Sequence, residues 1–388
     1  TNADSFSGRD GDDTFSFSGA VDGGDSVDGG VGNDQIIGSS GNDTLTLSTI
    51  SSIEYIDFGA GTDTMRASVD GTLDVSSYTV DVDLVGLERL SDNTGTESVI
   101  GTDQADTIVM TADTNADSFS GRDGDDTFSF SGSVNGGDII DGGLGNDQIM
   151  GSGGSDTLRL SSLTDVESID FGAGDDSFVV YTALDFTGMV IDMGAGTDYL
   201  RAHTNNTLDM STYTLGVEFL NLEYITDSSG SETVIGTNQA DTIWMTNDYS
   251  ADTFSGNDGD DVFNFSGNIH RSDSIDGGAG NDRINGSSGN DTLLLSSLTN
   301  VEYVDFGAGD DAFVTRAGMT PGGFTIDMGD GTDYMMAQLH NTLDIAGYTL
   351  GVDLLGLEYI TDNTGGETII ATNQNDEIRI KDDLYADS

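Results

Sequence analysis

The chain has 388 residues and carries 70 Asp and Glu against 11 Lys and Arg, a formal net charge of −59. This negative charge opposes binding to nucleic acid or anionic lipid, so neither is an expected partner. The absence of Cys excludes a disulfide framework, a thiolate zinc site and a cysteine nucleophile. No apolar run reaches the roughly 18 residues of a transmembrane helix, so no membrane insertion is expected.

The composition also predicts a missing cation. Low hydrophobicity with high net charge is typical of disorder, yet Phe, Tyr and aliphatic residues recur at regular intervals, as in strands. Two carboxylates about 5 Å apart repel by roughly 3 kcal/mol at an effective dielectric near 20. Because 11 basic residues can neutralise only a small part of the 70 acidic ones, a bound cation is expected to supply the missing positive charge.

Long internal repeats organise the chain. Residues 1–19 recur unchanged at 114–132, and a variant follows at 249–267. The repeats predict super-repeats at 1–113, 114–248 and 249–383, with 384–388 opening a further one. The start lacks Met and a signal peptide, so a mature or excised piece of a longer protein is expected.

One segment distinguishes the first super-repeat from the others. Residues 175–196 have no counterpart in it, whereas 310–331 keep a similar stretch. A solenoid can gain or lose one coil because each coil contacts only its neighbours. The segment is therefore predicted to be one whole coil.

A nine-residue period lies within each super-repeat. Residues 29–37 and 38–46 both read G-G/S-x-G-N-D-x-U-x, where U is a large aliphatic residue. The glycine-rich half predicts a turn, and the D-x-U-x half a short strand with U pointing inward. Two such units predict coils of about 18 residues, some nearer 21, with Phe15, Ile36, Leu45 and Met65 in the core. The predicted fold is an all-β solenoid of stacked parallel strands.

Stacked turns would bring carbonyls and Asp carboxylates together along the solenoid edges. Cages of six to eight oxygens suit hard cations, and Ca²⁺ tolerates irregular geometry best. About one Ca²⁺ is predicted per glycine-rich loop. The loops with the better motif contain Asp13, Asp34, Asp43, Asp63, Asp126, Asp147, Asp156, Asp176, Asp198, Asp261, Asp282, Asp291, Asp311 and Asp333.

The units beginning at Gly29 and Gly38 resemble the repeats-in-toxin (RTX) calcium-binding nonapeptide. The resemblance implies a right-handed parallel β-roll, calcium-driven folding after export, and type I secretion to the exterior of a Gram-negative cell. It also implies that turn carbonyls and the Asp at position six bind the ion. Residues 382–388 resemble the opening of another repeat instead of a secretion signal, so the natural protein is expected to continue.

Carried over residue by residue, the resemblance assigns the same position-six Asp residues and adds turn positions one and three. The loop of Gln104, Ala105 and Asp106 lacks both glycines and is not predicted to be a full site. The added positions are Gly8, Asp10, Gly29, Val31, Gly38, Ser40, Asp123, Gly142, Leu144, Gly151, Gly153, Asp258, Gly277, Ala279, Gly286 and Ser288.

Catalytic motifs are missing from the sequence, so no enzyme activity is predicted. There is no nucleophile elbow, no phosphate-binding loop and no EF-hand glutamate, and carboxylate pairs are too common to single out a glycosidase site. Tyr224, Tyr359 and Trp244 could stack on sugars, although such aromatics more often flank a strand ladder.

The predicted function is that of a secreted calcium-binding structural protein, of the S-layer or extracellular-matrix type. The expected partners are copies of itself, joined head to tail through residues 1–5 and 384–388, and cell-surface polysaccharide. The alternatives are a calcium-rigidified adhesin stalk and a noncatalytic module of a secreted polysaccharide-active protein.

Overall fold

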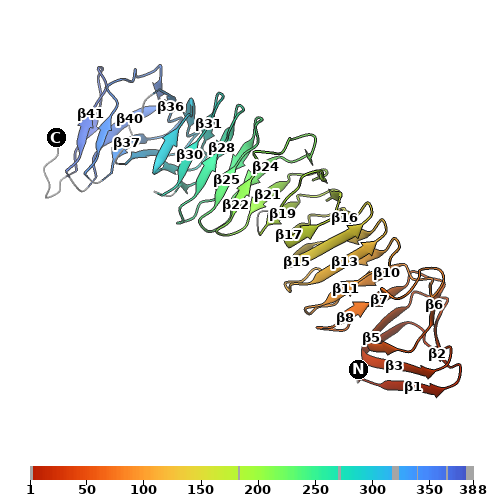
Figure 1. Cartoon of the computed structure of the whole chain (residues 1–388). Helices are drawn as coiled ribbons and strands as arrows, with labels where there is room; N and C mark the ends of the chain where they lie inside the picture. Colours follow the sequence, from red (N-terminus) through yellow and green to blue (C-terminus); the bar gives the residue numbers. More distant parts are fainter. Residues whose placement is uncertain are drawn as a thin grey trace. The chain divides into compact units, whose positions relative to one another are not determined.

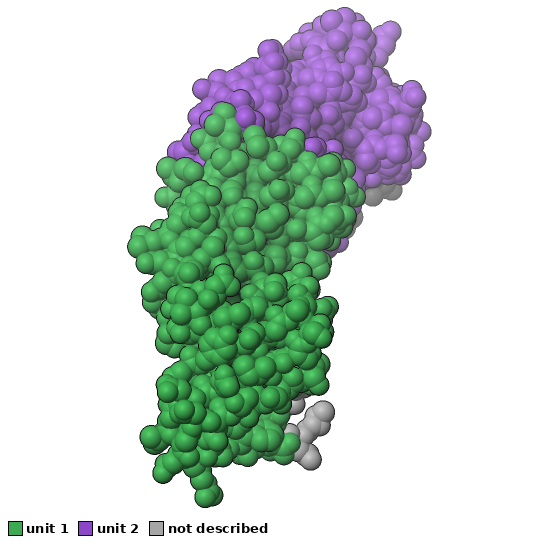
Figure 2. Space-filling model, turned by 90° about the vertical axis from the view of Figure 1, so that its right-hand side faces the viewer, with its two compact units in different colours: residues 1–198, 217–221 green, residues 199–216, 222–388 purple. Residues whose placement is uncertain are grey.

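The computed structural model describes residues 3–181, 184–269, 272–316, 323–338, 340–363 and 366–381. These residues form two compact units, unit 1 (residues 1–198 and 217–221) and unit 2 (residues 199–216 and 222–388), shown in Figure 2. The described residues contain strands, turns and bends but no helix. Among them there is therefore no helix long and apolar enough to cross a bilayer. Figure 1 shows the strands with their labels.

The strands of unit 1 lie in parallel ladders, in which successive members are hydrogen-bonded neighbours. The longest ladder comprises β1 (Ser5–Asp10), β3 (Ala20–Val31), β5 (Thr44–Ser51), β7 (Thr64–Arg66), β10 (Arg89–Ser91), β12 (Thr107–Val109), β14 (Thr127–Ser129), β16 (Gln148–Met150), β18 (Ser168–Asp170), β20 (Val190–Asp192) and β23 (Phe219–Leu220). The second comprises β2 (Thr14–Ser16), β4 (Gln35–Ser39), β6 (Tyr55–Gly59) and β9 (Leu84–Val85). The third comprises β8 (Thr72–Asp74), β11 (Ser98–Ile100), β13 (Ser118–Asp123), β15 (Ser133–Leu144), β17 (Thr157–Thr164) and β19 (Ser177–Val180).

Unit 2 has the same construction. Its first ladder comprises β21 (Tyr199–Ala202), β24 (Tyr224–Thr226), β26 (Thr242–Trp244), β28 (Val262–Asn264), β31 (Arg283–Asn285), β34 (Tyr303–Asp305), β36 (Thr325–Asp327) and β39 (Leu354–Leu355). The second comprises β22 (Thr207–Asp209), β25 (Thr233–Ile235), β27 (Thr253–Ser255), β30 (Ser274–Asp276) and β33 (Ser297–Thr299). The others comprise β29 (Asn268–Ile269), β32 (Thr292–Leu293), β35 (Ala312–Thr315), β37 (Asp333–Ala337), β40 (Leu357–Thr361) and β42 (Ile378–Arg379), and β38 (Thr342–Asp344) with β41 (Thr368–Ile370).

Strands adjacent in a ladder are separated in sequence by a full circuit of the chain. Thr14 of β2 pairs with Gln35 of β4, and Thr127 of β14 pairs with Gln148 of β16. Parallel neighbours joined this way are the coils of a β-solenoid, which confirms the predicted fold class.

Coil length varies more than the nine-residue period predicts. The Asp13 amide reaches the Asp34 carboxylate over 21 residues, and the Asp63 amide reaches Glu88 over 25. Leu90 pairs with Ile108, a coil of the 18 residues expected from two nonapeptides. The longer coils carry connections outside the repeat, such as the one between β8 and β9. The segment 175–196 adds one coil, since the Asp176 amide donates to the carboxylate of Asp198, 22 residues on.

The interior of each unit is a narrow apolar column. Ile36, Leu45 and Met65 expose 3 % or less of their surface, as predicted, whereas Phe15, in the second strand of the structure, is half-buried. Phenyl rings two coils apart meet edge to face across a glycine of the coil between them, with Phe130 and Phe171 centred 5.8 Å apart across Gly151 in unit 1. In unit 2, Phe265 and Phe306 are centred 6.2 Å apart across Gly286. Because a coil is too thin to bury its own apolar face, this stacking supplies the core.

Candidate metal centres in the turns

A ladder of hydrogen bonds links the aspartates that precede the strands. The amide of Asp106 donates to Oδ1 of Asp126, and the amide of Asp126 donates to Oδ1 of Asp147, both over 2.7 Å. The amide of Asp147 then donates to Oε2 of Glu167 over 2.6 Å. The same pattern recurs in unit 2, where Asp241 donates to Asp261 and Asp261 to Asp282. A main-chain amide of the preceding coil thereby holds each carboxylate in place at the turn of its own coil.

The ladder buries the carboxylates. Except for the half-buried Asp13, every predicted position-six Asp exposes at most 1 % of its surface. Buried carboxylates normally find partners for both oxygens, because a buried and unpaired charge is very costly. The buried residues are Asp34, Asp43, Asp63, Asp126, Asp147, Asp156, Asp176, Asp198, Asp261, Asp282, Asp291, Asp311 and Asp333.

Many of these carboxylates nevertheless keep one oxygen unsatisfied. Their Oδ2 atom is buried and has no hydrogen-bond partner among the described residues. Such an atom needs a cation or a proton, and the sequence offers few Lys or Arg to supply the former. The residues concerned are Asp13, Asp34, Asp63, Asp126, Asp147, Asp176, Asp261, Asp282, Asp311 and Asp333.

A carbonyl oxygen of the next coil lies beside the unsatisfied carboxylate oxygen, at the first glycine of the turn. A Cβ placed on Gly121 would lie 2.1 Å from Oδ2 of Asp126 and 2.6 Å from the carbonyl oxygen of Gly142. In unit 2, a Cβ on Gly256 would lie 2.1 Å from Oδ2 of Asp261. Only glycine leaves room here, and the space holds converging oxygens from two coils. Carboxylate and carbonyl oxygens are the donors that Ca²⁺ prefers, so these residues fit a calcium ion.

The side chains at position three of the turns are exposed, so the group that this position can present to a buried ion is its main-chain carbonyl. Val31 and Leu144 each expose 71 % of their surface, and Asp10, Asp123, Asp258 and Ala279 are likewise exposed. The carbonyl oxygen of Leu144 accepts a 2.8 Å hydrogen bond from the amide of Gly124 in the preceding coil. A carbonyl has two lone pairs, so it retains one for a cation.

The electrostatics of the metal-free turns oppose ionisation. Burial raises the pKa of Asp126 to about 7, the Asp106 amide opposes that rise, and the charges of Asp106 and Asp147 add to it. Burial raises the pKa of Asp261 to about 7 for the same reasons. A divalent cation would reverse this balance by pairing with the charged form.

In a second class of turn, which we call closed, the Asp carboxylate accepts hydrogen bonds from a residue of the same turn. Turns whose Oδ2 atom lacks a partner among the described residues are called open. In the turn 38–43, Oδ2 of Asp43 accepts a 2.6 Å hydrogen bond from the amide of Ser39, and Oδ1 accepts one from the Ser39 hydroxyl. The amide of Ser152 donates to Asp156 in the same way, and that of Ser287 to Asp291. These turns match the motif in sequence as well as the open turns do, yet both oxygens have protein partners.

The residue at position two distinguishes the two classes. In open turns it has a left-handed backbone, with φ of 102° at Gly143 and 84° even at Arg122. In closed turns it is Ser or Thr, whose amide points back to the carboxylate. Glycine populates the left-handed region without cost, whereas Ser and Thr side chains favour local hydrogen bonds. The nonapeptide consensus alone does not reveal this difference.

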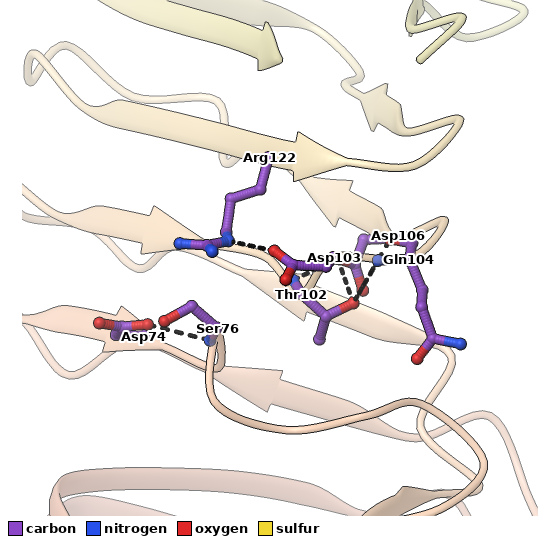
Figure 3. A network of polar contacts seen from close by, with 7 residues as sticks. All are labelled: Asp74, Ser76, Thr102, Asp103, Gln104, Asp106 and Arg122. Atoms are coloured by element: carbon purple, nitrogen blue, oxygen red, sulfur yellow. Dashed lines mark hydrogen bonds and ion pairs between the residues drawn. The ribbon is translucent and has the colours of Figure 1, made fainter. Parts of the chain in front are cut away.

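The turn that lacks the glycines is closed as well (Figure 3). Oδ2 of Asp106 accepts hydrogen bonds from the amide of Thr102 at 2.6 Å and from its hydroxyl at 3.0 Å. Beside it, Arg122 forms a 2.8 Å ion pair with Asp103 on the surface. The protein therefore supplies hydrogen-bond partners to Oδ2 of Asp106, the oxygen that lacks a partner in the open turns.

Sequence reasoning missed several buried carboxylates that also lie on the ladder. Glu97 and Asp117 in unit 1, and Glu232 and Asp252 in unit 2, expose 3 % or less of their surface. Each directly precedes a strand, as the motif aspartates do, but no Gly-Gly pair precedes it. The sequence pattern that could have identified these carboxylates is an Asp or Glu two residues before an inward-facing apolar residue of a strand.

The aromatic residues considered for sugar stacking lie in strand ladders. Tyr224 stacks on Tyr199 with ring centres 5.3 Å apart and meets Trp244 edge-on at 6.3 Å. The Tyr359 ring has Tyr334 at 5.4 Å and the Arg379 guanidinium at 3.6 Å. These cross-strand contacts match the ladder interpretation of the rings.

Comparison with protein families supports the same assignment. The model of the RTX calcium-binding nonapeptide repeat matches four segments, residues 20–48, 134–166, 248–267 and 271–295. Comparison with curated proteins found none that matches the chain. Together with the parallel solenoid and its oxygen-lined glycine turns, the four matches show that the chain carries RTX calcium-binding nonapeptide repeats.

Proposed function

We propose that the chain is a noncatalytic structural protein of an extracellular surface layer or matrix, made rigid by calcium in its turns. The observation that carries the proposal is the recurrence of open turns through both units, each with a buried Asp oxygen that lacks a partner among the described residues. A protein that binds calcium at a single site needs only one such turn. A structural solenoid needs a site at many turns, because every coil must be attached to the next one.

The residues of an open turn would hold the ion between two coils. Asp126 would supply a carboxylate oxygen, and Gly142 and Leu144 would supply carbonyl oxygens from the next coil. When bound, calcium supplies positive charge to buried carboxylates and joins the two coils. Its loss would leave the repulsion between neighbouring carboxylates uncompensated, so folding and calcium binding would be coupled.

A periodic set of exposed apolar residues supports assembly between copies. Val82, Val217 and Val352 occupy the same position of the long repeat, and each exposes at least 60 % of its surface. An apolar residue kept on the surface once per super-repeat offers a partner regularly spaced contacts. We take a second copy of the chain as that partner. Location outside a Gram-negative cell after type I secretion is part of the proposal.

Electron microscopy and sedimentation of the chain, with and without millimolar Ca²⁺, test assembly. Ordered layers or filaments that need calcium are expected. The combined variant Val82→Ser, Val217→Ser, Val352→Ser should weaken them, whereas Thr72→Ser, Thr207→Ser, Thr342→Ser, at exposed positions of equal spacing, should not. A monomer that stays single at high concentration while binding calcium would overturn the layer proposal and favour the adhesin stalk.

A further inference from the structure

Two buried carboxylate triads lie outside the nonapeptide turns. Asp92, Glu97 and Asp117 form one in unit 1, and Asp227, Glu232 and Asp252 form the other in unit 2. In each triad, one oxygen from every member lies within 4.8 Å of the others, and all six residues expose 3 % or less of their surface. The two triads occupy the same position of the long repeat.

The fold brings each triad together from two neighbouring coils. In unit 2, Asp227 follows β24, while Glu232 and Asp252 directly precede the paired strands β25 and β27. The amide of Glu232 donates to Oδ1 of Asp252 over 2.8 Å, which fixes these two carboxylates in register. The amide of Thr246 donates to Oδ1 of Asp227 over 2.8 Å. The carboxylates are thus positioned by main-chain donors.

Two oxygens of the unit 2 triad have nothing to pair with. Oδ2 of Asp227 and Oε2 of Glu232 are buried and lack a hydrogen-bond partner among the residues that the structure describes. None of the three ion pairs found between described residues includes a triad carboxylate. Buried like charges at this separation, with orphaned oxygens between them, call for a cation.

In the unit 1 triad, by contrast, both oxygens of Asp92 accept a hydrogen bond from the Thr111 amide, and both oxygens of Glu97 accept one from a main-chain amide. We propose that the unit 2 triad is a cation site of a second class, which binds Ca²⁺ through three carboxylates. The open turns offer one carboxylate with main-chain carbonyls, so the unit 2 triad carries more charge than a turn does. Affinity for Ca²⁺ rises with the charge count and rigidity of the ligands, and this triad should bind more tightly than the turns. Mg²⁺ normally retains several waters and takes one or two carboxylates, so it fits a dry triad poorly.

The position of the only Trp of the chain provides a local reporter. Trp244 ends β26, and Thr226, which pairs with it, directly precedes Asp227. The Thr226 hydroxyl donates to the Trp244 carbonyl over 2.9 Å. A luminescent lanthanide bound at the unit 2 triad would therefore be sensitised by Trp244.

The test titrates Tb³⁺ into the whole chain in excess Ca²⁺, with excitation where Trp absorbs and Tyr does not. We expect sensitised emission at low Tb³⁺ in the parent and its loss in Asp227→Asn/Glu232→Gln. The matched variant Asp92→Asn/Glu97→Gln changes the unit 1 triad, and unit 1 has no Trp, so its emission should be retained. Asp282→Asn, in a nonapeptide turn of unit 2, should also retain it.

Two further measurements keep the test independent of folding. Circular dichroism in Ca²⁺ establishes that each variant is folded, and the single isosteric change Glu232→Gln replaces the double variant if that one is not. Equilibrium dialysis against a weak chelator then counts tightly held calcium, of which the unit 2 triad variant should lose one ion and the unit 1 variant none. Unchanged emission together with unchanged tight calcium in a folded variant would overturn the proposal, while leaving calcium binding by the turns intact.

Discussion

The amide of Asp126 donates a 2.7 Å hydrogen bond to Oδ1 of Asp147, the equivalent aspartate of the next coil. Asp147 thus has one oxygen engaged by its neighbour, whereas its Oδ2 is buried without a partner among the described residues. The same side chain therefore joins two coils through Oδ1 and offers Oδ2 to a cation. Removal of calcium, single substitutions and changes of pH can distinguish the contribution of the hydrogen bond from that of the cation.

The first prediction concerns removal of calcium. In excess chelator the buried carboxylates have no compensating charge, so the chain should lose its strand signal in circular dichroism. Millimolar Ca²⁺ should restore it, and Mg²⁺ should do so poorly, because it demands a smaller octahedral site. A chain equally folded in chelator and in calcium would contradict the assignment of the turns.

The second prediction concerns a single turn. Asp34→Ala removes both the acceptor of the Asp13 amide and a buried oxygen facing the turn. A buried donor left unsatisfied costs about 1–3 kcal/mol, so calcium-saturated stability should fall by about that amount and the calcium midpoint of folding should rise. Asp81→Asn is the control, because Asp81 is exposed and outside the motif and Asn tolerates its left-handed backbone, with φ of 61°. Equal midpoints for the two variants would mean that bulk charge and not coordination drives folding.

The third prediction concerns the closed turns. Ser39→Gly removes the hydroxyl that binds Asp43 and lets position two adopt the left-handed backbone of open turns. Oδ2 of Asp43 should then become available, and bound calcium per chain should rise at subsaturating Ca²⁺. Ser40→Gly, at the exposed position beside it, should leave binding unchanged. Equilibrium dialysis measures both, and identical binding would show that position two does not control the turn.

The fourth prediction concerns pH in the absence of calcium. Burial raises the pKa of Asp126 and of Asp261 to about 7 in the fold, from 3.8 without burial. A raised carboxyl pKa gives stability that is full below the unfolded value and is lost as pH rises through the folded one. In chelator, the strand signal should therefore be stronger near about pH 5 than near about pH 8. Circular dichroism across this range checks the sign, and a signal that grows with pH would refute it.

Calcium should reverse this dependence. Protons and Ca²⁺ compete for the same oxygens, so acidification should weaken calcium binding while it favours the metal-free fold. Titrations with Ca²⁺ at the two pH values separate these effects. A calcium midpoint that does not move with pH would indicate that the buried carboxylates are not the ligands.

The period of the sequence was enough to predict the solenoid, most of its inward-facing residues and the positions of its glycine-rich turns. It could do so because a coil contacts only its neighbours, so a local period such as that of Gly29 to Ile37 specifies nearly every contact. The difference between open and closed turns emerged only from the folded backbone. With Gly143 at position two, Oδ2 of Asp147 has no partner among the described residues, whereas with Ser39 at position two, Oδ2 of Asp43 accepts a hydrogen bond from the Ser39 amide. The triads likewise required the folded chain, since Asp227, Glu232 and Asp252 meet only when separate coils stack. A nine-residue period predicts the contacts that every coil makes in the same way. Contacts between segments outside the period depend on the length of the chain between those segments, which the period does not give.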